Sequence, residues 1–305
     1  FVHVMAAGGS FLDQGRSIVV DDKGNTFVTG DFVGAAAFGT TKITSKGGSD
    51  VFVAKFDIKA NLVWVATAGG TMKDTGTSIA VDPTGSGYVA GSFNGKATFG
   101  AWILSSQGYS DIFVARLDDL GKFTWAVSSG GTQGDAADSI AVDAAGNSYI
   151  TGGYGSNATF GTTSLSSHGY SNIYAAKLDN SGKYTWATSV GCSNQTHNRG
   201  RSIAVGQSGT SYIAGGFEGT ATFGATSMWA KYGTKVFIAK LSSTGQFAWA
   251  DSAGGTYATS FAVDASGRGY VTGVFQNAAE FGTTSLFSKG KLDIFVVKLG
   301  KLTGF

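Results

Sequence analysis

The sequence predicts an all-β fold made of repeated antiparallel sheets. Three observations predict it: one apolar phrase recurs five times in 305 residues, glycine is abundant at 48 while proline occurs once, and no stretch shows the period of an amphipathic helix. A collagen-like chain is excluded because glycine follows no three-residue period. A disordered chain is excluded because 42% of the residues are hydrophobic and only 14% are charged.

The first phrase of each repeat is a serine followed by an apolar run, which ends at aspartate in most copies. The copies begin at Ser17, Ser78, Ser139, Ser202 and Ser260. The second phrase begins with an aromatic residue and ends with glycine. Its copies begin at Phe27, Tyr88, Tyr149, Tyr212 and Tyr270. Short runs of β-branched and aromatic residues bounded by Gly, Asn, Asp or Ser are typical of strands.

Three further phrases complete each repeat. The third ends in Phe-Gly, with its phenylalanine at Phe38, Phe99, Phe160, Phe223 and Phe281. The fourth is an apolar strand with one cation, at Lys55, Arg116, Lys177, Lys240 and Lys298. The fifth carries Trp64, Trp125, Trp186 and Trp249, with His3 at the equivalent first position. We expect the tryptophans to fill the space between neighbouring sheets.

The turns between the phrases can be read from their residues. Asp at the first position and Gly late in the turn is hairpin chemistry, as in Asp143–Asn147 and Asp179–Gly182. Pro83 stands at the second turn position, where its fixed φ fits. We expect the first-position aspartates to cap their turns by accepting hydrogen bonds from backbone N–H groups. In the first turn of each repeat these are Asp21, Asp82, Asp143 and Asp264.

Each unit of about 61 residues is therefore predicted to be an antiparallel sheet of four strands, with a short fifth strand around the Phe-Gly phrase as a variant. The units are 1–61, 62–122, 123–183, 184–246 and 247–305. Five such sheets bury both faces when they pack around an axis, which predicts one five-bladed β-propeller domain over residues 1–305. A linear solenoid is the alternative. Phe1 occupies the repeat position of Phe123, so we expect residues 1–7 to pair with Asp293–Lys298 and close the ring.

The repeats resemble a known family. The string Ser139-Ile-Ala-Val-Asp-Ala-Ala-Gly-Asn-Ser-Tyr-Ile-Thr-Gly152, followed by Ala158-Thr-Phe-Gly161 and Asn172-Ile-Tyr-Ala-Ala-Lys177, is similar to the bacterial SBBP-type β-propeller repeat. The resemblance covers all five copies and implies a propeller, although the family's name implies seven blades. It also implies a secreted or surface-exposed protein, often beside adhesion-type domains, and no particular activity.

Charge and composition argue against several partners. The 22 basic and 20 acidic residues give a net charge of +2 without a basic run, which argues against nucleic acid. No apolar run reaches the ~18 residues of a membrane helix, so we expect no membrane insertion. Cys192 has no intramolecular partner, and His3, His168 and His197 occupy unrelated repeat positions. Zinc spacing and a phosphate loop are both missing, so we expect no metal and no cofactor.

Catalytic residues are equally sparse. A glycoside hydrolase needs two facing carboxylates. The carboxylates that break the repeat symmetry are Asp31, Glu218, Asp251 and Glu280. Nothing in the sequence places two of them together, so we expect a non-enzymatic protein and keep a glycoside hydrolase as the less favoured alternative.

The cation of the fourth phrase lies in an apolar strand and therefore needs a partner. Asp50, Asp111 and Asp293 begin the same phrase, whereas Asn172 and Lys235 take that place in the other two copies. We expect a structural ion pair wherever the aspartate is present.

The candidate binding residues are those that break the repeat symmetry. The longest departure from the repeat pattern is a polar loop in the fourth repeat. Loops of this kind at the end of a propeller are usual ligand sites. It brings together Asn194, His197, Arg199 and Arg201. An ordinary solvated loop is the alternative.

The second departure is aromatic. Trp102 and Trp229, like Phe287, replace small residues of the other copies. Exposed rings could stack on sugars or contact a protein, and extra packing within the sheet is the alternative. The glycosylation sequons at Asn157 and Asn194 are as frequent as chance predicts.

These observations together predict an extracellular, non-enzymatic propeller that binds or scaffolds at a cell surface, with a glycan or a surface protein as its partner. The alternative is a structural subunit of a surface layer, fibre or appendage, whose partners are copies of itself. Recognition predicts a saturable ligand, and assembly predicts apolar lateral patches. Fold alone does not decide between them.

Overall fold

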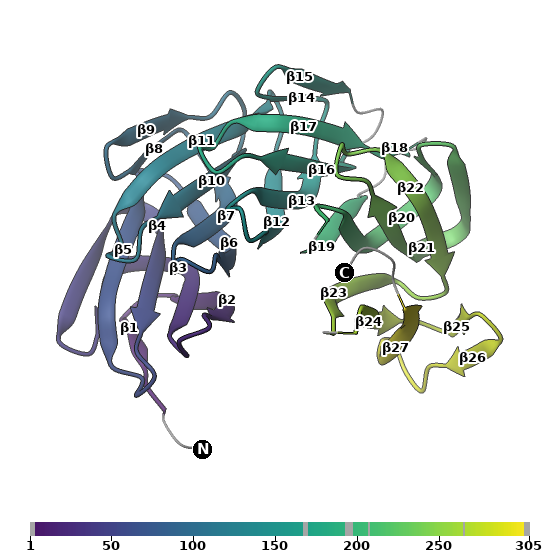
Figure 1. The fold of residues 1–305 in the computed structure, drawn as a ribbon, viewed down its shortest axis with the longest axis horizontal. Helices are drawn as coiled ribbons and strands as arrows, with labels where there is room; N and C mark the ends of the chain where they lie inside the picture. The colour runs from purple at the N-terminus through teal and green to yellow at the C-terminus, as the bar shows by residue number, and fades with distance from the viewer. Residues whose placement is uncertain (1–3, 167–169, 193–197, 207, 265, 302–305) are drawn as a thin grey trace. The chain divides into compact units, whose positions relative to one another are not determined.

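The computed structural model describes residues 4–166, 170–192, 198–206, 208–264 and 266–301. All regular elements of these residues are strands, which confirms the predicted all-β class (Figure 1). The chain forms two compact units. Unit 1 comprises Phe1–Ser148 and Asp179–Lys183, and unit 2 comprises Tyr149–Leu178 and Tyr184–Phe305.

From here on, a repeat is counted by its sheet, from the strand with the recurring serine to the strand with the tryptophan. Counted in this way, unit 1 holds the first two repeats and the first strand of the third. Its strands are β1 (Ala7–Gly9), β2 (Gln14–Val20), β3 (Thr26–Phe38), β4 (Thr41–Phe56), β5 (Leu62–Gly70), β6 (Asp74–Val81), β7 (Gly87–Phe93), β8 (Lys96–Phe99), β9 (Trp102–Ser105), β10 (Asp111–Leu117), β11 (Phe123–Gly131) and β12 (Ala136–Val142). The predicted phrases pair in antiparallel order as β2-β3-β4-β5 in the first repeat and β6-β7-β10-β11 in the second.

Unit 2 holds the rest of the third repeat and the last two. Its strands are β13 (Ser148–Tyr154), β14 (Asn157–Phe160), β15 (Thr163–Ser166), β16 (Asn172–Leu178), β17 (Tyr184–Ser189), β18 (Gly191–Cys192), β19 (Arg199–Val205), β20 (Ser211–Phe223), β21 (Thr226–Leu241), β22 (Phe247–Ala253), β23 (Tyr257–Val263), β24 (Arg268–Phe275), β25 (Ala278–Phe281), β26 (Thr284–Phe287) and β27 (Asp293–Lys301). The fourth repeat pairs as β19-β20-β21-β22, and the described part of the fifth as β23-β24-β27.

The Phe-Gly phrase forms a two-stranded hairpin instead of a single fifth strand. In three repeats the hairpin strands are distinct from the two long strands that precede and follow them, as β8–β9, β14–β15 and β25–β26. In the first and fourth repeats it continues the long strands β3–β4 and β20–β21. Glycine follows the phenylalanine because the hairpin turn needs a positive φ there, 58° at Gly100 and 60° at Gly161.

The recurring serine of the first phrase links the first strand of one repeat to the first strand of the next. Its hydroxyl oxygen accepts the backbone N–H one repeat later. The described cases are Ile79 N to Ser17 Oγ at 3.3 Å, Ile140 N to Ser78 Oγ at 3.2 Å and Phe261 N to Ser202 Oγ at 3.0 Å. This bond satisfies a backbone donor between sheets, which explains why the position is always serine.

The recurring cation lies over an aromatic ring of its own repeat. In the first repeat Phe27, Lys55 and Trp64 stand directly opposite one another on β3, β4 and β5. The Lys55 ammonium is 5.1 Å from the centre of the Phe27 ring, within cation–π range. The same contact recurs at 5.0 to 5.6 Å for Arg116 on Tyr88, Lys177 on Tyr149, Lys240 on Tyr212 and Lys298 on Tyr270.

The tryptophan of this row reaches the turn of the next repeat. Trp64 Nε1–H donates to Asp119 O at 2.9 Å, and a Cβ on Gly121 would lie 2.6 Å from the Trp64 ring. Trp125 meets Asn180 O and Gly182 in the same way, at 3.0 Å and 2.8 Å. The expectation that these rings pack between neighbouring sheets is therefore confirmed for Trp64 and Trp125.

The predicted ion pairs with Asp50, Asp111 and Asp293 are wrong. Each aspartate precedes its cation by five residues, an odd number, so the two side chains point to opposite faces of the strand. The described cations sit over aromatic rings, and Arg116 also approaches Asp82 at 3.9 Å.

The turn aspartates cap their turns as predicted. Asp21 Oδ1 accepts hydrogen bonds from Lys23 N at 2.9 Å and Asn25 N at 2.8 Å. Asp82, Asp143 and Asp264 accept the equivalent pairs.

The N-terminal strand does not close a ring in the described residues. Strand β1 pairs with β3, with Ala7 opposite Phe38. Residues 1–3 lie outside the described part, and β27 pairs with β24 alone in the described part. The pairing of β1 with β3 has a counterpart in the next repeat, where Gly69 and Gly70 at the end of β5 pair in the same way with β8.

The tryptophan contact predicts a large stability difference between two tryptophan variants. Trp125 is 7% exposed, whereas Trp229 is 61% exposed. We expect Trp125→Ala to lower the free energy of unfolding by about 3–5 kcal/mol, because it empties a packed position. Trp229→Ala, the matched control, should change it by less than about 0.5 kcal/mol. Denaturant titration followed by circular dichroism checks this, and equal losses would contradict it.

Candidate functional site

The described part of the predicted polar loop lies at the start of β19 in unit 2. Asn194 and His197 fall outside the described residues. Arg199 is half-buried, and Arg201 is exposed at a β-bulge between Gly200 and Ser202. The Arg201 guanidinium is 4.3 Å from the centre of the Tyr257 ring. One predicted binding residue is thus held over a neighbouring strand while its donors remain at the surface.

The same bulge recurs just before the serine on the first strand of other repeats. The sequence pattern did not identify its residues as binding candidates in those repeats. Arg16 occupies this bulge in unit 1, between Gly15 and Ser17. Arg16 forms an ion pair with Asp31, and its Nη2 also donates to Gln14 Oε1 at 2.5 Å. Bulges redirect a side chain out of the strand pattern. The one available signal was the variable residue just before each recurring serine.

Trp229 and Phe287 are exposed aromatic residues of unit 2 that break the repeat symmetry. They occupy equivalent hairpin positions, opposite Thr220 on β20 and opposite Ala278 on β25. Trp229 is 61% exposed and Phe287 is 75% exposed. Both rings therefore present apolar faces to solvent, as the sequence predicts for a contact surface.

Trp102 has a different environment. It stands opposite Phe99 in the β8–β9 hairpin and packs, partly buried, against the apolar cluster of unit 1. This ring fills space within the sheet, so the packing alternative holds for Trp102.

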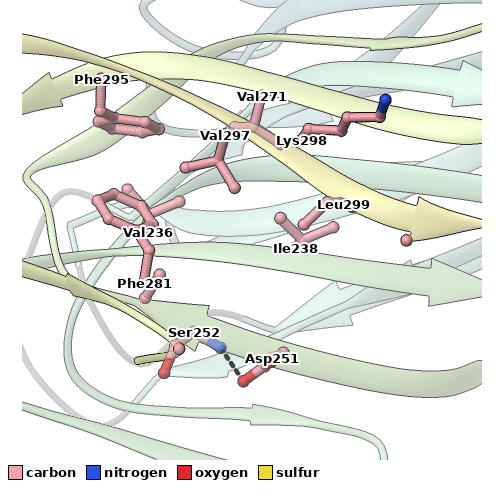
Figure 2. A pocket seen from close by; sticks show the side chains of 13 residues that line it. Val236, Ile238, Asp251, Ser252, Val271, Phe281, Phe295, Val297, Lys298 and Leu299 are labelled. Atoms are coloured by element: carbon pink, nitrogen blue, oxygen red, sulfur yellow. Dashed lines mark hydrogen bonds between the residues drawn. The ribbon is translucent and has the colours of Figure 1, made fainter. Parts of the chain in front are cut away.

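A cavity of about 300 Å³ lies between the last two repeats of unit 2 (Figure 2). Val236, Ile238, Phe281, Phe295 and Val297 contribute most of its apolar wall. Its polar edge comprises Asp251, Ser252 and Lys298, and Asp251 accepts a hydrogen bond from Ser252 N at 2.8 Å. The walls are therefore mainly apolar, with one carboxylate and one ammonium group among them.

The cavity adjoins an aromatic position that other repeats fill. In the fourth repeat Phe223 stacks edge-on against Phe247 with ring centres 5.5 Å apart, and Phe247 Cβ lies 3.2 Å from where a Cβ on Gly224 would stand. Phe281 contacts Phe295 with ring centres 4.8 Å apart, but no atom of the described residues lies within 4 Å of where a Cβ on Gly282 would stand. In the described residues of the fifth repeat, the ring equivalent to Phe247 is therefore missing beside Phe281 and Phe295, and the cavity adjoins this position.

Two of the carboxylates that break the repeat symmetry, Asp31 and Glu218, have side-chain partners. Asp31 pairs with Arg16, and Glu218 accepts a hydrogen bond from the Thr234 hydroxyl at 3.0 Å. The described residues hold no cluster of three or more potential metal ligands. No helix in the described residues has the length and apolar character to cross a membrane.

Cys192 is buried at the end of β18, 3% exposed. Burial raises the pKa of its thiol to about 12. A thiol with this pKa stays protonated at neutral pH and is a poor nucleophile or metal ligand.

No known protein-family model matches the chain. Over 252 residues, 68% of this chain and 18% of the relative, the chain is 25% identical to an uncharacterized WD repeat-containing protein of Acanthamoeba polyphaga mimivirus. Over 144 residues, 45% of this chain and 15% of the relative, it is 33% identical to the regulatory protein FlaEY of Caulobacter vibrioides. The chain spans less than a fifth of the length of these relatives.

One solved structure, a protein of unknown function from Bacteroides caccae, aligns with 85% of this chain and 70% of its own. The TM-score is 0.43 and the sequence identity is 9%.

The buried thiol predicts slow chemistry at Cys192. With its pKa raised to about 12, the thiol should not react with Ellman's reagent at pH 8 while the protein is folded. One thiol per chain should react at once in 6 M guanidinium, which serves as the internal control. Stoichiometric reaction of the folded protein within seconds would contradict this environment.

Proposed function

We propose that this chain is an extracellular, non-enzymatic binding and scaffolding module that recognises a glycan or a surface protein through its exposed aromatic hairpins. One observation carries the proposal: the side chains that recur in every repeat are taken up by structural contacts. The cations lie over rings, and the first-turn aspartates cap their turns. The exposed residues that break symmetry, Trp229 and Phe287, have no such structural role.

We propose further that the repeats are the five blades of one propeller, as the SBBP-type resemblance implies. The mimiviral relative is a WD repeat-containing protein, which supports this architecture because such repeats form propeller blades. The strongest support is that apolar positions buried in the middle repeats are exposed in the first and last. Ile18 is 68% exposed, whereas Ile79 and Ile140 are each 5% exposed.

The last repeat shows the complementary exposure. Ile294 is 76% and Val296 is 74% exposed on β27, whereas Val51 and Val53 at the equivalent positions of β4 are fully buried. In the first repeat β5 covers that edge of β4. Residues 1–7 repeat the pattern of β5 and β11, and Phe1 would supply the third ring missing beside Gly282. We therefore propose that this segment covers β27 and closes the ring.

The alternative function, a structural subunit of a fibre or layer, is favoured by the same exposed edge. If residues 1–7 cover β27 of another copy, the chains assemble head to tail instead of closing on themselves. The two functions thus differ in which chain supplies the strand.

A cross-link distinguishes these outcomes. In a Cys192→Ser background we expect Met5→Cys and Val296→Cys to form a disulfide, because Ala66 and Val53 are opposite at the equivalent positions. Non-reducing electrophoresis should show a compact monomer for a closed ring, and linked ladders for assembly. Met5→Cys with Val297→Cys is the control, because neighbouring positions point to opposite faces. Without a disulfide in the first pair, both arrangements are wrong.

Recognition is tested on a glycan array with the labelled chain. We expect saturable binding to at least one glycan, and Trp229→Ala should weaken that binding at least tenfold, because a ring stacked on a sugar contributes about 1.4 kcal/mol or more. Ser105→Ala, at the equivalent hairpin position of the second repeat, is the matched control and should bind like the parent chain. Binding that Trp229→Ala leaves unchanged would remove this surface from the proposal.

A further inference from the structure

Two pairs of buried aspartates lie at the junctions between consecutive repeats of unit 1. Asp50 and Asp74 form the first pair, and Asp111 and Asp135 form the second. No side chain of the four is more than 1% exposed. In each pair the first aspartate lies on the cation-bearing strand of one repeat, and the second precedes or begins the inner strand of the next.

A glycine lies between the two carboxyl groups of each pair. A Cβ on Gly130 would lie 2.8 Å from Asp111 Oδ1 and equally 2.8 Å from Asp135 Oδ2. A Cβ on Gly69 would lie 2.5 Å from Asp50 Cγ, and the adjacent Gly70 N donates to Asp74 Oδ2 at 2.7 Å. The carboxyl groups thus converge where only glycine leaves room for them.

One oxygen of each pair has no hydrogen-bond partner. Asp74 accepts backbone N–H groups on both oxygens, from Gly70 at 2.7 Å and from Asn94 at 3.3 Å. Asp50 Oδ2 accepts Lys46 N at 3.2 Å, but Asp50 Oδ1 is buried without a partner. Asp111 Oδ1 is in the same position. A buried oxygen left in this state is costly unless it carries a proton that it can donate.

One cation faces the two carboxyl groups of the first pair. Lys46 is the cation that acts on Asp50 and Asp74, and its ammonium also contacts Gly69 O at 3.4 Å. Asp111 is stabilised only by backbone N–H groups of Gln107 and Gly108. Burial raises the pKa of Asp50 and Asp111, and burial together with the Asp50 charge raises the pKa of Asp74 to about 7.

The third junction carries amides in place of the carboxyl groups, although a Cβ on the equivalent Gly191 would meet Thr222 and not Asn172. Asn172 and Asn198 in unit 2 occupy the positions of the two aspartates and are no more exposed. Asn198 Oδ1 accepts Glu218 N at 2.7 Å, as Asp74 Oδ1 accepts Asn94 N. The Ser171 hydroxyl donates to Asn198 O at 3.2 Å, and Ser49 donates to Asp74 O at the same distance. Asn172 Oδ1 is buried without a hydrogen-bond partner, as Asp50 Oδ1 and Asp111 Oδ1 are. An amide that presents its NH2 group at this place donates as a protonated carboxyl does, so neutral groups fit this junction.

We propose that each aspartate pair holds one shared proton, placed on the unpartnered oxygen of Asp50 or Asp111 and donated to the partner carboxylate, which makes these two junctions pH-sensitive clamps between repeats. The pair titrates as a unit. Loss of the proton leaves two buried negative charges beside each other, which loosens the junction.

The direction of the effect follows from linkage. The folded protein keeps a proton that the unfolded chain loses near pH 4, so stability is greatest at low pH and falls as pH rises toward about 7. Over this range each pair raises the unfolding equilibrium constant up to tenfold per pH unit, and above it the effect levels off. The capped turn aspartates have lowered pKa values, so their titration lies below this range.

The test compares urea unfolding of the parent chain and of Asp50→Asn/Asp111→Asn between pH 5 and pH 7. We expect the unfolding constant of the parent to rise at least tenfold more across this range than that of the variant, with the variant more stable at pH 7. Asp57 caps an exposed turn by accepting hydrogen bonds from Lys59 N and Asn61 N. Asp57→Asn, which removes the charge of this cap, is the control and should keep the parent's pH slope. Comparing variants cancels the three histidines.

The reciprocal change makes the test independent of one variant's folding. Asn172→Asp/Asn198→Asp should install a third pair and steepen the pH slope. Equal slopes in the parent and in both variants would overturn the proposal. Stabilisation of the parent by 1 mM Ca²⁺ at pH 7, absent from Asp50→Asn/Asp111→Asn, would also overturn it, because the pair would then hold a cation instead of a proton.

Discussion

The structure depends on one interaction that crosses from each repeat to the next: a cation over an aromatic ring, with a tryptophan beside it that packs on the next repeat's turn. Phe27, Lys55 and Trp64 show it in the first repeat. The strand register aligns the three side chains on one face, and the glycine of the following turn admits the indole. The row therefore holds a cation against a ring, and the tryptophan of the same row fixes the spacing between sheets.

This contact explains how the recurring residues are used. A cation pressed on a ring, an aspartate capping a turn and a serine accepting the N–H of the next inner strand are all committed to architecture. Under the proposed binding function, specificity would reside where copies differ. The bulge before the serine and the outer hairpins are such places, because a substitution there leaves the repeat-to-repeat contacts intact. Arg201 and Trp229 occupy these two kinds of position.

Strands and turns could be predicted from the sequence because local composition determines them, as in the apolar run before Gly30 and the capped turn at Asp21. The partner of Lys55 could not, because proximity in sequence suggested Asp50 although an odd spacing places the two on opposite faces. Trp102 and Trp229 look alike in the sequence. Their environments differ because Trp102 faces the apolar cluster and Trp229 faces solvent, a distinction that arises only from the sheet's register and packing.

The junctions show why a repeat can tolerate different chemistry at a fixed geometry. At Asp50 and Asp111 the constraint is a planar polar group that lies against a glycine and accepts a backbone N–H. At Asn172 and Asn198 buried neutral amides occupy the equivalent positions. Amide and protonated carboxyl both meet that constraint, whereas two ionised carboxylates do not. The repeat thus conserves a shape and lets the charge vary, and a chain that retains aspartate at two of these junctions makes its internal packing dependent on proton concentration.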